Sequence, residues 1–154
     1  MDIEYLGREA IAMAIRAELL EPAKSCSVHL DQLINKLREV KKSGCLNIFS
    51  YSPGQNAINK ETNAEIRILL ELAKKDCAAF LRDLEADDDW HECFANPAFY
   101  QRSIAIIGER LEAVKLDQSI LSLTTQLENI SNNMHGVLDT FIEFSCVEGP
   151  IELR

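Results

Sequence analysis

Proline and glycine are scarce in this chain. Four prolines and six glycines are spread over 154 residues, so few positions oppose a helix. Long apolar runs are missing too, because none approaches the roughly 20 residues that a membrane-spanning helix needs. Residues 1–20 place acids where a secretory signal carries bases, and their apolar residues are spaced rather than continuous. We therefore expect a soluble cytoplasmic protein with no membrane segment.

A disulfide framework is also missing. The five cysteines are odd in number and widely spaced, and no CxxC motif occurs. Without a secretory signal, such cysteines are most simply small, buried, apolar residues of a protein in a reducing compartment.

Basic residues are rare in the second half of the chain. Residues 1–82 hold 12 Lys/Arg and 11 Asp/Glu, whereas residues 83–154 hold 4 Lys/Arg and 14 Asp/Glu. The net charge of −9 therefore comes from the second half. Direct nucleic-acid binding needs the opposite sign, so we do not expect it. The negative charge suits a partner protein with a basic surface, mimicry of nucleic acid, or solubility alone.

Helical spacing of apolar residues runs along nearly the whole chain. It predicts a first helix that ends or kinks at Pro22. A second helix is predicted over residues 28–40, because two lysines and then Gly44 suit a helix C-terminus.

Two further helix starts are marked by capping residues. Thr62 with Glu65 forms a capping box, and Asn96 followed by Pro97 is typical of a first helical turn. The fold class that we predict is all-α, with residues 1–154 forming a single domain. It is a helical bundle of about four to five helices with a long C-terminal helix.

A heptad pattern marks the C-terminal third of the chain. Its apolar seam alternates spacings of four and three through Leu116, Ile120, Leu123, Leu127, Ile130, Met134, Val137, Phe141 and Phe144. An out-of-phase stripe precedes it, so residues 97–146 either form one helix or break near residues 115–119. Positions beside the seam are uncharged, namely Ser119, Thr124, Gln126, Ser131, Asn133, Leu138, Thr140 and Ser145. Such flanks favour a helix packed on several sides, inside a bundle or in a homodimer through the 116–144 stripe.

The stretch DLEADDDWHECFANP, residues 83–97, gathers acids around the single tryptophan. An EF-hand fails there, because its required glycine and final glutamate are both missing. A weaker metal or acid–base site would use Asp87, Asp89, His91 and Cys93. A zinc site could also combine His91 and Cys93 with ligands from the set Cys26, His29, Cys45 and Cys77. The spacing of these residues matches no recognised zinc motif, and simple burial of the cysteines explains them better. Glycine-rich phosphate loops, GxSxG and HExxH are all missing.

Contact with a partner is the other interpretation of this stretch. Trp90 either anchors an interface or folds back onto the preceding helix. The loop 45–60, with Phe49 and Tyr51, is a second contact candidate or a plug for one end of the bundle. The acids that would meet a basic partner are Asp83, Glu85, Asp87, Asp88 and Asp89.

These observations favour a non-catalytic function without a cofactor. We expect a small acidic cytoplasmic protein that binds another protein, as an inhibitor, immunity protein, chaperone or adaptor does. The alternative is a metal-dependent enzyme or metal-binding protein that uses the region from Asp87 to Cys93.

Overall fold

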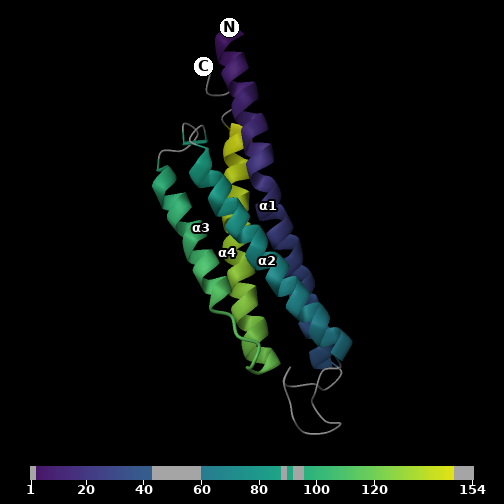
Figure 1. Ribbon diagram of the computed structural model, residues 1–154. Helices are drawn as coiled ribbons and strands as arrows, with labels where there is room; N and C mark the ends of the chain where they lie inside the picture. The colour runs from purple at the N-terminus through teal and green to yellow at the C-terminus, as the bar shows by residue number, and fades with distance from the viewer. Residues whose placement is uncertain (1–2, 43–59, 88–89, 92–95, 148–154) are drawn as a thin grey trace.

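Four helices pack as an up-and-down bundle (Figure 1). The computed structural model describes residues 3–42, 60–87, 90–91 and 96–147. The helices are α1 (Ile3–Lys42), α2 (Lys60–Ala86), α3 (Pro97–Glu112) and α4 (Ile120–Val147). Each packs against its neighbours in the chain, and α1 closes the ring on α4. The predicted all-α bundle is confirmed. None of these helices is long and apolar enough to cross a membrane.

Helix α1 continues through Pro22, so the prediction of two separate helices in this part of the chain is wrong. A proline inside a helix costs about 3 kcal/mol, because it removes a hydrogen bond and crowds the preceding turn. Each buried leucine contributes about 1.5–3 kcal/mol, so burial on both sides of the proline outweighs that cost. The buried residues are Leu19 and Leu20 before it and Ala23, Cys26 and Leu30 after it.

The N-terminus of α3 lies where the sequence predicts it. Asn96 accepts a hydrogen bond from the backbone N–H of Phe99 at 3.3 Å, and Pro97 occupies the first turn. The predicted start of α2 is less accurate, because the helix begins at Lys60, before the proposed capping residue Thr62. Lysines do end α1, as expected for a helix C-terminus.

Residues 97–146 are two helices, with the break between Glu112 and Ile120. Ser119 begins the second helix, because its hydroxyl accepts a hydrogen bond from the backbone N–H of Ser122 at 3.1 Å. The C-terminal helix α4 has 28 residues, whereas α1 has 40. The longest helix is therefore at the N-terminal end of the described chain.

The heptad seam of α4 faces the interior of the bundle. Its buried members are Ile120, Leu123, Leu127, Ile130, Met134, Val137 and Phe141. The part of the 116–144 stripe from Ile120 to Phe141 therefore packs into the chain's own core. Helix α4 lies between α1 and α3 in the bundle.

Candidate functional site

The predicted acidic contact lies only partly within the described residues. Asp83 and Glu85 are on the last turns of α2, and Asp87 follows its end. Asp83 lies 3.8 Å from the guanidinium of Arg82, and the side chain of Glu85 is exposed. Asp88 and Asp89 lie outside the described residues, as do the loop residues Phe49 and Tyr51.

Trp90 is a core residue. Its side chain is 1% exposed, and its indole N–H donates a 2.8 Å hydrogen bond to the carbonyl oxygen of Leu84. The ring packs against Phe141 of α4, with centroids 5.9 Å apart. Of the two interpretations left open, the structure shows the one in which the tryptophan folds back onto α2. Trp90 therefore offers no side chain to a partner.

No group of three or more metal-ligating side chains occurs among the residues that the structure describes. Of the predicted ligands, Asp87 and His91 are described, whereas Asp89 and Cys93 are not. The Nε2 atom of His91 is buried without a hydrogen-bond partner in the described structure. The ring of His91 lies edge-on to Trp90 at 4.3 Å, which is aromatic packing rather than a ligand arrangement.

The other zinc candidates that are described have different partners. His29 lies 2.7 Å from the carboxylate of Asp76, between α1 and α2. Cys26 and Cys77 are buried free thiols, and Cys26 donates to the carbonyl oxygen of Ala73 at 3.4 Å. The hydrogen bond with Cys77 and burial raise the pKa of the Cys26 thiol. These groups hold α1 and α2 together.

A serine, a histidine and an aspartate meet between α1 and α4, which the sequence did not predict. The Ser27 hydroxyl lies 3.3 Å from Nδ1 and 3.0 Å from Nε2 of His135, and Asp31 lies 3.2 Å from the same Nε2. A catalytic triad needs the serine and the aspartate on opposite ring nitrogens, and Ser27 is 4% exposed. The cluster is therefore a polar contact between two helices, made by residues more than 100 positions apart.

Two adjoining hollows lie between α3 and α4 on the described surface, and together we call them the α3–α4 groove. The first has a volume of about 380 Å³ and runs from Phe99 and Thr140 to Arg110. The second has a volume of about 680 Å³ and runs on towards Ala113 and Gln126. Both hollows share Arg110 and two asparagines, so they adjoin there.

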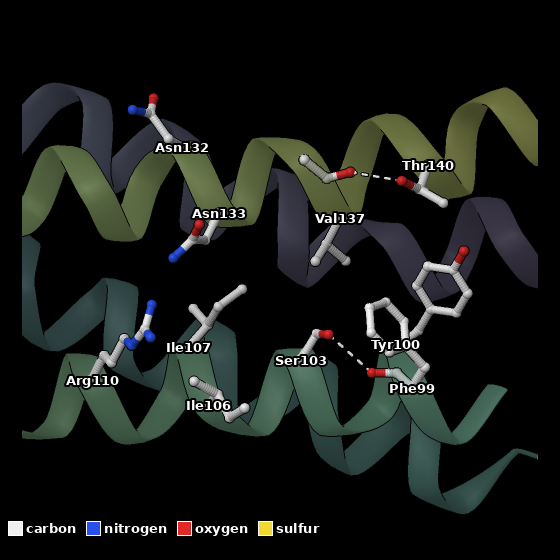
Figure 2. A pocket seen from close by; sticks show the side chains of 11 residues that line it. Phe99, Tyr100, Ser103, Ile106, Ile107, Arg110, Asn132, Asn133, Val137 and Thr140 are labelled. Atoms are coloured by element: carbon white, nitrogen blue, oxygen red, sulfur yellow. Dashed lines mark hydrogen bonds between the residues drawn. The ribbon is translucent and has the colours of Figure 1, made fainter. Parts of the chain in front are cut away.

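The groove has an apolar floor and a partly apolar rim (Figure 2). Ile107 of α3 and Val137 of α4 are almost fully buried and form the floor. On the rim, Phe99 is 56% exposed and Ile106 is 39% exposed. Apolar and aromatic side chains predominate in ligand-binding pockets, and aromatic residues are enriched at protein interfaces.

One side of α4 is open in this groove although its residues resemble those on the covered side. The covered flank comprises Thr124, Ser131 and Leu138, which are all buried. It faces α1, since Ser131 donates to Asp31 of that helix at 2.9 Å. The open flank comprises Gln126, Asn133 and Thr140, which line the groove. The sequence predicted a helix packed on several sides, and on this flank Gln126 and Thr140 are half-buried whereas Asn133 is exposed.

No protein-family model, curated protein or solved structure matches this chain. Its function is therefore argued from geometry and chemistry. The groove carries that argument, because the two sequence-predicted sites are either buried, as at Trp90, or partly outside the described residues.

Proposed function

We propose that this chain is a non-catalytic cytoplasmic protein that binds another protein, and that the α3–α4 groove receives a segment of that partner. The open flank of α4 carries the proposal. Two of its three residues, Asn133 and Thr140, have low helix propensity, and glutamate or lysine at these positions would stabilise a solvated helix better. On the covered flank, the small polar residues Thr124 and Ser131 are buried, and Ser131 donates to Asp31 of α1.

Gly136 supports the same conclusion. A Cβ atom added there would have no neighbour within 4 Å, so packing within the described chain does not require glycine. Glycine in a helix costs about 1 kcal/mol relative to alanine. A partner's backbone that approaches α4 closely would explain why this cost is tolerated.

The apolar rim supplies part of the binding free energy. Phe99 and Ile106 are both partly exposed, and burying both side chains against a partner would contribute about 2 kcal/mol to the free energy of binding. The α3–α4 groove is large enough for a short segment of a partner. It is too small for a standard protein interface, which buries about 800 Å² on each partner. The interaction would therefore be of the small, transient kind.

Negative charge outside the groove suits a partner with a basic surface. Asp83, Glu85 and Asp87 at the end of α2 belong to the acidic excess of residues 83–154. Such charge raises the association rate and makes it sensitive to salt. Reversing Asp87, Asp88 and Asp89 to lysine is expected to slow association, and unchanged kinetics at low salt would remove the acidic contact from the proposal.

Gly136→Leu is the variant that tests the groove. The added side chain would fill the open space beside Gly136, and leucine favours the helix. Gln32→Leu is the matched control, because it adds the same side chain at an exposed position of α1. Wild type and both variants would be used in parallel as affinity baits in lysate of the native host, after their unfolding midpoints are shown to agree.

A protein retained by the wild type and by Gln32→Leu but lost from Gly136→Leu is the expected result. If every retained protein binds Gly136→Leu as well as it binds the wild type, the groove is not the binding surface.

A further inference from the structure

Arg110 lies at the centre of the α3–α4 groove and lines both hollows. Among the described residues that line them, it carries the only charge, and none is a carboxylate. Arg110 forms no ion pair or hydrogen bond with any residue in the described ranges. In a chain of net charge −9, a binding surface with one cation and no anion is suited to a ligand with a carboxylate. The planar guanidinium matches a carboxylate with two parallel hydrogen bonds.

Two asparagines of α4, Asn129 and Asn133, line the groove together with Arg110. Asn133 and Arg110 point towards one another across the space between α4 and α3 (Figure 2). Asn129 lies one helical turn away and lines the second hollow. Neither amide has a hydrogen-bond partner within the described structure, and each offers both a donor and an acceptor.

These amides distinguish between two shapes of ligand. A helical segment has already paired its backbone groups and would leave both amides without partners. An extended segment presents free N–H and C=O groups, which match the paired donor and acceptor of a side-chain amide. Gly136 lets such a backbone approach α4 closely.

The length of the groove limits the ligand. From Phe99 to Ala113 is 14 residues of helical rise, or about 21 Å. An extended chain covers that distance with about six residues. Apolar side chains at one end of such a segment would contact Phe99 and Ile106, and an acid near its middle would reach Arg110.

We infer that the ligand of the α3–α4 groove is an extended peptide segment of a partner protein, held by its main chain at Asn129 and Asn133 and by a carboxylate at Arg110. This inference rests on the proposed function and adds the chemistry and conformation of the bound segment.

The test is a selection from phage-displayed random peptides, each long enough to hold about six extended residues, against the full-length protein. Enriched peptides are expected to combine an acidic residue with apolar residues. Their dissociation constants are expected to rise about tenfold in Arg110→Gln, since one charge-assisted contact is lost. A parallel selection against Arg110→Glu is expected to enrich lysine or arginine where the acid stood.

Backbone conformation is tested on the best peptide by inserting α-aminoisobutyric acid, which favours a helix. Weaker binding is expected, together with a loss of affinity in Asn129→Ala/Asn133→Ala. If the helix-favouring residue strengthens binding, or if Arg110→Gln binds as well as the wild type, the inference is wrong. The proposed function would survive in both cases, provided that Gly136→Leu still abolishes binding.

Two other outcomes have distinct meanings. Peptides that bind Gly136→Leu and the wild type equally would contradict the groove itself, and so the proposed function as well. A selection that enriches nothing above background would overturn the extended-peptide inference, and the bait comparison would then decide the proposed function alone.

Discussion

Replacing Trp90 with alanine tests whether this single tryptophan stabilises the core or serves as a contact for a partner. The indole N–H bonds to the carbonyl oxygen of Leu84, which belongs to the last turn of α2 and has no partner inside that helix. Since Trp90 is 1% exposed and packs on Phe141, Trp90→Ala is expected to cost about 3–5 kcal/mol in the free energy of unfolding. An exposed interface anchor would cost almost nothing in the isolated protein.

Trp90→Phe divides that cost into two parts. The phenyl ring keeps much of the contact with Phe141 but loses the hydrogen bond to Leu84. A buried carbonyl without a partner costs about 1–3 kcal/mol, so Trp90→Phe is expected to lie between the wild type and Trp90→Ala.

Urea unfolding followed by far-ultraviolet circular dichroism measures both variants. With a slope of about 2 kcal/mol per molar urea, a loss of 4 kcal/mol lowers the midpoint by about 2 M. Glu85→Ala is the control, because this exposed neighbour is expected to change stability by no more than about 0.5 kcal/mol. A loss below about 1 kcal/mol for Trp90→Ala would refute the core assignment.

Three further experiments test the groove, the cap of α3 and the burial of Cys26. Gly136→Ala is expected to raise the free energy of unfolding by about 0.5–1 kcal/mol, since the added methyl group meets open space and reduces the freedom of the unfolded chain; a destabilised variant would contradict the open groove. Asn96→Ala is expected to lower it by about 1 kcal/mol, with Asn96→Asp close to the wild type, because the side chain caps α3; equal losses for both would argue against capping. Cys26 is expected to resist iodoacetamide in the native protein even near the ordinary thiol pKa of about 8.5. The hydrogen bond with Cys77 and burial raise the pKa of Cys26, so a rising pH yields little thiolate there; mass spectrometry showing rapid native modification would contradict this.

Local signals predicted the ends of helices with mixed success. Asn96 and Pro97 locate the start of α3 correctly, because capping depends on residues within one turn. The prediction of two separate helices around Pro22 is wrong. The free-energy cost of a proline inside a helix is smaller than the free energy gained by burying leucines on both sides of it. That burial depends on α2 and α4, which no local window contains.

The candidate site was predictable only in part. The uncharged flanks of the 116–144 stripe indicated a helix covered on several sides, and Ser131 and Leu138 are indeed buried. Asn133, on the other flank, faces an open groove opposite Arg110. The sequence could not predict this, because it depends on the distance between α3 and α4. The same limit applies to Trp90, for which sequence allowed either an exposed anchor or a buried lid.

The sequence by itself determined that this protein is a bundle of helices with an acidic second half, because apolar periodicity and charge are properties of the linear chain. Only the tertiary structure decided which polar residues are buried, which cluster together and which remain open. Ser27 and His135 illustrate the reason, because they are 108 positions apart and meet only when α1 packs against α4. Arg110 and Asn133 likewise share a groove only because α3 and α4 run side by side.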